Sequence, residues 1–187
     1  MTPTSEQCIA DTRRWLERAV IGLNLCPFAK AVHVKGRIHY AVSRASQPRD
    51  LLDDLRHELQ ALMAQAPETR ETTLLMAPAC LLEFIDFNDF LRMADRLLRK
   101  LGLEGVIQLA SFHPQYAFAG AEQDDISNYT NRAPYPTLHL LREDRIAQAL
   151  AGFAELQLIY ESNIQTLTSL GKVGWAALQV DAGAGTP

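Results

Sequence analysis

The sequence predicts an α/β or α+β domain, a ferredoxin-like or related sandwich in which about five helices pack on a four-stranded mixed sheet. Apolar residues recur at helical spacing in stretches that alternate with short strand-like runs. Strands that alternate with helices imply parallel neighbours, so we expect the first three strands to be parallel. A long irregular segment follows the third strand, and we expect the fourth strand to be antiparallel.

The first helix and the first strand have clear sequence signals. Thr4, with Gln7 three residues later, matches a capping box, and apolar residues then follow at helical spacing. A residue before proline is forced out of the helical region, so Pro27 should end this helix and leave Cys26 at its C-terminus. Residues 32–43 alternate apolar and polar side chains, which is typical of a strand with one buried face.

The second helix and strand follow directly. Ser46 can cap the helix, with Pro48 in its first turn, and Pro67 should end it. Residues 72–77 form a short, nearly all-apolar run, as expected for a strand that is covered on both faces. This strand should therefore lie inside the sheet.

The third helix is expected to begin at Asp86, a good N-cap, and to end before Gly102, which suits the left-handed residue past a helix. Residues 105–112 should form the third strand. The last elements are a strand at 137–141 and helices at 144–151 and 160–170. We expect one domain over residues 1–180 and a disordered tail over residues 181–187.

The segment between the last two strands, residues 113–136, is the feature most indicative of function. Connections this long without helix or strand pattern are usually functional or disordered. Four aromatic residues argue for an ordered loop. Ligands of open α/β sheets bind outside the carboxyl ends of parallel strands. The sequence therefore predicts a site at that edge, beneath the 113–136 loop.

Composition narrows the function classes. The chain has 187 residues, of which 48% are hydrophobic and 21% charged, as in ordinary soluble globular proteins. A net charge of −4 argues against a nucleic-acid partner. No apolar run is long enough to span a membrane, and three cysteines without C-x-x-C spacing argue against a disulfide framework. We expect a cytoplasmic protein with a small-molecule ligand; the pattern indicates no oligomeric state.

Three residues are candidates for catalysis. Cys26 could act as a nucleophile if a nearby cation or base activated its thiol, or it could simply pack the helix end. His113, where the third strand leaves the sheet, could be a general base or could hold the turn through backbone hydrogen bonds. His139 could converge with His113 if their faces meet, or it could be a core histidine with its hydrogen bonds satisfied.

Polar and aromatic residues near the loop are candidates for substrate binding. Arg132 can bind a carboxylate or phosphate through bidentate hydrogen bonds, or it can pair with the acidic residues of its own loop. Asp124 and Asp125 with Asn128 could bind a hard cation, supply a base or cap a turn, and the spacing of a calcium loop is absent. We predict no metal ligand. The predicted substrate-binding residues are Lys30, Asn128, Tyr129, Asn131, Arg132 and Tyr135.

Known motifs give little more. The sequence contains neither of the common glycine-rich phosphate loops and no G-x-S-x-G, so it identifies no cofactor. The runs LNLCPFA, SFHP and NYTNRAPYPTLHLLRE, which begin at Leu23, Ser111 and Asn128, resemble an uncharacterised bacterial family, the domain of unknown function numbered fourteen-fifteen. The resemblance covers about residues 7–172 and implies no activity.

Three functional hypotheses result. The first is a small enzyme that acts on a polar, anionic small molecule under the 113–136 loop. The second is a non-catalytic module that binds a ligand or a partner through the aromatic residues and arginine of the loop. The third is a metalloprotein that uses Cys26, His113 and His139, although no local ligand spacing supports it.

Overall fold

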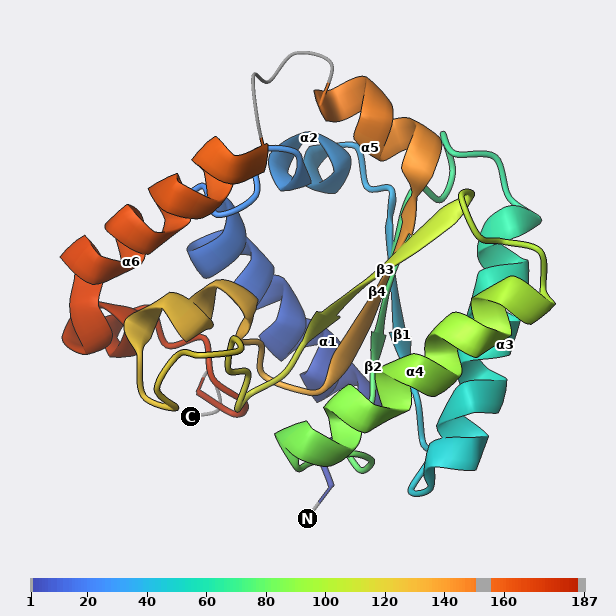
Figure 1. Ribbon diagram of the computed structural model, residues 1–187, viewed down its shortest axis with the longest axis horizontal. Coiled ribbons are helices and arrows are strands. Elements are labelled where there is room, and N and C mark those ends of the chain that lie inside the picture. The colour runs from blue at the N-terminus through green and yellow to red at the C-terminus, as the bar shows by residue number, and fades with distance from the viewer. Residues whose placement is uncertain (1, 151–155, 185–187) are drawn as a thin grey trace.

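The computed structural model describes residues 2–150 and 156–184 (Figure 1). Helices and strands alternate through most of the chain, as predicted. In order, the elements are α1 (Ser5–Trp15), the π-helical η1 (Leu16–Ile21), α2 (Ala29–Val34), β1 (Ile38–Val42), α3 (Pro48–Met63), β2 (Thr72–Met76), α4 (Phe84–Lys100), β3 (Ile107–Phe112), the 3-10 helix η2 (Ile126–Asn131), β4 (Thr137–Arg142), α5 (Glu143–Leu150) and α6 (Leu156–Ala177).

The four strands form one mixed sheet in the order β1-β2-β4-β3, which confirms the mixed α/β class. Only β1 and β2 pair in parallel, whereas β4 pairs antiparallel with both β2 and β3. β1, β2 and β3 run in the same direction, but the prediction that the three are parallel neighbours was wrong, because β4 lies between β2 and β3. The long connection before β4 lets the chain turn back and insert this strand between β2 and β3, where a helical crossover would have added a parallel neighbour.

The pairing register still aligns the strands at one edge of the sheet. Val42 pairs with Met76, Met76 with Thr137, and Thr137 with Phe112, so β1, β2 and β3 end where β4 begins. The next row on the same face holds Tyr40, Leu74, His139 and Ala110. This face is the one on which the candidate site lies.

Helices cover both faces of the sheet (Figure 1). On one face, α3 and α4 pack through leucine and phenylalanine side chains such as Leu55 and Phe87 against Leu75, Leu138 and Leu140. On the other face, α1 and η1 pack against the row of Tyr40 and His139, with α6 beyond them. A ferredoxin-like sandwich has its helices on one face, so that part of the prediction was wrong.

Helix ends follow the predicted signals in part. Thr4 caps α1, accepting a hydrogen bond from the Gln7 amide at 3.2 Å, and Gly102 takes the left-handed conformation with φ +67°. The predicted caps Ser46 and Asp86 were wrong, because α3 and α4 begin at Pro48 and Phe84. Asp86 instead lies in the first turn of α4, where its negative charge interacts favourably with the helix dipole.

The segment before β1 differs most from the prediction. Residues 29–34 form the short helix α2, which includes the first three residues of the predicted strand 32–43. Gly36 then turns the chain at φ +66°, and β1 begins at Ile38. Because proline fits the entry to a helix as well as its end, Pro27 precedes a helix here. Cys26 therefore lies before the start of α2.

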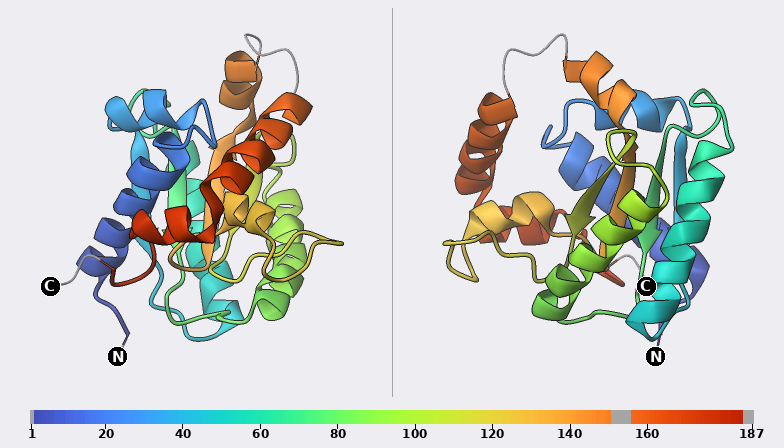
Figure 2. Two further views of the ribbon diagram at one scale, coloured as in Figure 1. Left: turned by 90° about the vertical axis from the view of Figure 1, so that its left-hand side faces the viewer. Right: turned by 45° about the vertical axis from the view of Figure 1, so that its right-hand side comes forward.

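The C-terminal part of the chain folds back on the N-terminal helix. The helix η2 forms inside the predicted loop and packs against α6 (Figure 2). Gly171, at φ +66°, kinks α6. Asp181 to Ala184, the start of the predicted tail, form a turn beside α1. Residues 185–187 of that tail lie outside the described residues, and so does residue 151 of the predicted helix 144–151.

Candidate functional site

A cavity of about 480 Å³ lies between the sheet and the segments that cover its α1 side. We call it the sheet-face cavity. It lies toward the edge where β1, β2 and β3 begin, opposite to the edge under the predicted loop. Its walls are mainly apolar and aromatic: Trp15, Val20, Phe28, Leu74, Ala110 and Phe112.

His139 lies on the sheet wall of this cavity. Its Nε2 is 2.7 Å from the hydroxyl oxygen of Thr72, which donates its own proton to the carbonyl oxygen of Leu140 at 2.6 Å. The ring packs beside Phe112, with centroids 6.1 Å apart. Burial lowers the pKa of His139 to about 4, so the imidazole is uncharged at neutral pH.

Cys26 lies on the opposite wall, in the segment that leads into α2. Burial raises the pKa of its thiol, and hydrogen bonds from the backbone amides of Phe28 and Ala29 offset this only in part. The thiol is therefore un-ionised at neutral pH. Two of the three predicted catalytic residues, Cys26 and His139, thus border one cavity, although they are far apart in the sequence.

The rim of the cavity carries charged side chains that already have partners. Glu71 pairs with Arg37 at 3.3 Å. Arg145 lies 2.9 Å from Glu68. Arg142 donates to the carbonyl oxygens at the C-terminal end of α3, at 2.6 and 2.7 Å. The walls of the cavity are thus mainly uncharged, and of the charged groups at its rim Arg142 has no carboxylate partner among the described residues.

His113, the third predicted catalytic residue, lines neither this cavity nor the one described next. It is fully buried between Phe84 and Phe87. Its Nδ1 accepts a hydrogen bond from the Gln115 amide at 3.0 Å, so Nε2 carries the proton and donates to the Leu81 carbonyl at 3.1 Å. These contacts favour the turn-holding role over the catalytic one.

A second cavity, of about 410 Å³, lies between η2, α6 and the C-terminal turn. We call it the loop cavity. Tyr129 and Arg132 line it, as do Lys172 and Trp175 of α6. Arg132 lies over the Tyr129 ring at 4.2 Å and donates to two loop carbonyls, and no described carboxylate lies within ion-pair distance of it. Lys172 pairs with the exposed Asp124 at 2.7 Å.

The other predicted substrate-binding residues lie elsewhere. Asn128 is fully buried and bonds the loop to itself, through the Phe118 amide and the Glu122 carbonyl. Asn131 donates to the Ser111 carbonyl at 3.3 Å. The exposed Lys30 borders neither cavity. Tyr135 is buried against α1.

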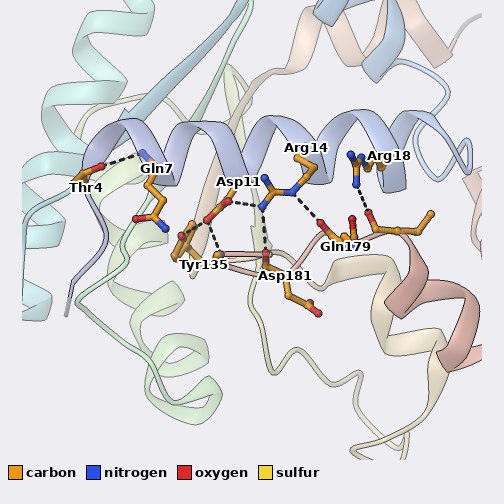
Figure 3. A network of polar contacts seen from close by, with 10 residues as sticks. Thr4, Gln7, Asp11, Arg14, Arg18, Tyr135, Gln179 and Asp181 are labelled. Carbon is orange, nitrogen blue, oxygen red and sulfur yellow. Dashed lines mark hydrogen bonds and ion pairs between the residues drawn. The ribbon is translucent and has the colours of Figure 1, made fainter. Parts of the chain in front are cut away.

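Tyr135 belongs to a polar network that sequence reasoning missed (Figure 3). The buried carboxylate of Asp11 accepts hydrogen bonds from the Tyr135 hydroxyl at 2.6 Å and the Gly183 amide at 2.9 Å, and it pairs with Arg14. Burial alone would raise the pKa of Asp11, but these bonds outweigh it and lower the pKa overall. The network ties α1, the segment before β4 and the C-terminal turn together.

A sequence signal for Asp11 existed. It lies three residues after Cys8 and four before Trp15, in the stripe of α1 that is buried. A carboxylate in a buried stripe requires partners. Thr72 gave a weaker signal, as a polar residue at the start of an apolar strand. Among the described residues, no three histidines, cysteines or acidic residues come together as a metal site would need.

Comparison with known proteins gives the family. A family model described as "Protein of unknown function (DUF1415)" matches residues 7–177. The chain belongs to this family. The resemblance predicted from the sequence is therefore confirmed, and the DUF1415 match includes Cys26, His113 and His139. No curated protein and no solved structure matches the chain. No helix within 2–150 or 156–184 is long and apolar enough for a membrane span.

Proposed function

We propose that this DUF1415 protein binds a small, mainly apolar molecule in the sheet-face cavity. One observation carries the proposal: an apolar hollow of about 480 Å³ interrupts a region that is otherwise packed core. Protein interiors hold few voids larger than a water molecule. Ligand pockets commonly measure about 300–1,000 Å³ and combine apolar walls with a few polar groups.

The polar groups of the cavity suit binding. Cys26 and His139 are both uncharged at neutral pH, so an apolar molecule that contacts them desolvates no charge there. This favours the ligand-binding module over the enzyme among the functions predicted from the sequence. An enzyme that used the same cavity would have Cys26 as nucleophile and His139 as base. The bound molecule would then have to lower the pKa of Cys26 and raise that of His139.

Binding of toluene, followed by NMR through the side-chain methyl groups, tests the proposal. Toluene should shift the methyl signals of Leu74 and Ala110 saturably and leave that of the exposed Val173 unchanged. It should also slow the alkylation of Cys26, because the bound molecule covers the thiol. Engineered apolar cavities of similar character bind benzene.

Two filling variants and one control sharpen the test. Ala110→Phe should abolish the shifts, because the new ring fills the cavity from the sheet, and Ala31→Trp should weaken binding from the rim. Val173→Phe places the same phenyl side chain at an exposed position and should bind toluene normally. Absence of saturable shifts in the wild-type protein, or unchanged binding in both filling variants, would contradict the proposal.

A second candidate is supported by the loop cavity. There Arg132 and Lys172 could hold the anionic small molecule predicted from the sequence, with Tyr129 and Trp175 as aromatic walls. The supporting observation is that no described carboxylate pairs with Arg132. In the same NMR experiment, benzoate should then shift the Trp175 indole N–H and not the methyl group of Ala110.

A further inference from the structure

We infer that the sheet-face cavity selects uncharged molecules that donate a hydrogen bond, and that Thr72 and His139 together impose this choice. The inference rests on the proposed function, because it concerns the chemistry of a molecule bound in that cavity. It adds the class of ligand: a mainly apolar alcohol, phenol or N–H compound.

The single hydroxyl proton of Thr72 decides which ring nitrogen of His139 is protonated. That proton points to the Leu140 carbonyl oxygen, which lies 2.6 Å from the hydroxyl oxygen. A carbonyl oxygen can only accept, so Thr72 must donate there. Toward His139 the hydroxyl oxygen can then only accept. The proton of the imidazole must therefore lie on Nε2, 2.7 Å away.

The second ring nitrogen of His139 is left as an acceptor. With the proton on Nε2, Nδ1 has a lone pair, and no residue that the structure describes donates a hydrogen bond to it. His139 is partly exposed where it lines the cavity. A bound molecule that presents O–H or N–H to Nδ1 gains a hydrogen bond, and a molecule with only acceptors does not.

Anions are disfavoured by the same arrangement. A carboxylate would bring its lone pairs against that of Nδ1 and would lose its hydration in an apolar space. Of the two cations near the rim, Arg145 pairs with Glu68, and Arg142 donates to backbone carbonyls without a carboxylate partner among the described residues. Although two cations line the rim, the lone pair of Nδ1 and the apolar walls disfavour an anion.

Titration with 4-methylphenol and 4-methylanisole tests the inference. The two molecules share the ring and the oxygen, but only the phenol can donate. We expect the phenol to bind about five- to tenfold more tightly to the wild-type protein, as one hydrogen bond implies. At pH 7, 4-methylbenzoate should bind more weakly than either.

Paired variants at position 72 assign the preference to the hydroxyl. Thr72→Ser keeps the hydroxyl and should keep the preference for the phenol. Thr72→Val keeps the shape and removes the acceptor, so the imidazole proton is free to move to Nδ1 and the two affinities should come within about twofold. Nitrogen-15 NMR of the imidazole needs no variant: in the wild-type protein His139 should show Nε2 protonated and Nδ1 unprotonated.

The outcomes separate the inference from the proposed function. Equal affinities for the phenol and the anisole in a protein that binds toluene would overturn the inference and leave the proposed function standing. A protonated Nδ1 in the wild-type spectrum would overturn it as well. If toluene, the phenol and the anisole all fail to bind, the proposed function and the inference fail together.

Discussion

Replacing Asp11 with asparagine should destabilise the protein by about 3 kcal/mol. The substitution keeps the size and shape of the side chain and removes its charge. Asp11 is 2% exposed and holds three segments of the chain together through Tyr135, Gly183 and Arg14 (Figure 3). The prediction therefore tests whether the C-terminal turn is held by a buried ionised carboxylate.

The expected magnitude follows from the three contacts of the carboxylate. A hydrogen bond to a charged group contributes about 1.5–3 kcal/mol and a neutral one about 0.5–1.5 kcal/mol. Loss of the charge should weaken the bonds from Tyr135 and Gly183 by about 1 kcal/mol each. The amide of asparagine would turn a donor toward Arg14 and remove that contact, at a further cost of about 1 kcal/mol. Relief from burying the charge is smaller than these losses, because the pKa of Asp11 is lowered overall.

Urea unfolding at pH 7, followed by far-ultraviolet circular dichroism, measures the change in free energy. Asp53→Asn is the matched control, since Asp53 also pairs with an arginine three residues along a helix, but at the surface. Exposed pairs contribute little, so this control should lose less than about 0.5 kcal/mol.

The pH dependence gives an independent check. The folded pKa of Asp11 lies below its unfolded value, so its contribution is present above the unfolded pKa and is lost as the pH falls through the folded one. The difference between wild type and Asp11→Asn should therefore stay constant from pH 7 to 5 and shrink below about pH 4. A loss no larger than that of the control, or a difference that grows in acid, would refute the reasoning.

Two further predictions concern the histidines. His113→Ala should lower the free energy of unfolding by about 2–4 kcal/mol, since it removes two hydrogen bonds of a fully buried ring and leaves a void between Phe84 and Phe87. Toluene binding should be unchanged. Lost binding with unchanged stability would instead favour a site at His113. His139, whose folded pKa of about 4 lies below its ordinary value of 6.5, should contribute stability that is fully present above pH 6.5 and decreases by up to about 3 kcal/mol as the pH falls through 4. Unfolding free energies of the wild type and His139→Phe from pH 7 to 4 measure this, and parallel curves would contradict it.

Local sequence signals predicted much of the fold. Helical and alternating periodicity gave the order of most elements, and capping chemistry gave the start of α1 at Thr4 and the turn at Gly102. The signals failed where a short stretch suits two structures. Pro27 is compatible with a helix end and with a helix entry, and the apolar residues 29–34 became helix α2 before the strand.

The candidate site was predictable only in its parts. Cys26 and His139 were identified as residues with chemical potential, and so were Tyr129 and Arg132, but the sequence did not indicate which of them meet. Cys26 and His139 border one cavity, Tyr129 and Arg132 border another, and His113 borders neither. The sequence predicted a site at the edge where the parallel strands end, whereas the sheet-face cavity lies toward the starts of β1, β2 and β3.

The amino-acid sequence by itself determined the α/β class, the alternation of helices and strands, and the family, because these depend on spacings within about twenty residues. The tertiary structure decided that β4 lies beside β2, which brings the hydroxyl of Thr72 to the imidazole of His139 and to the carbonyl oxygen of Leu140. It also decided that Asp11 meets Tyr135 across the fold. Such contacts join residues separated by 67 and 124 positions, and only the packing of strands and helices brings them within hydrogen-bond distance.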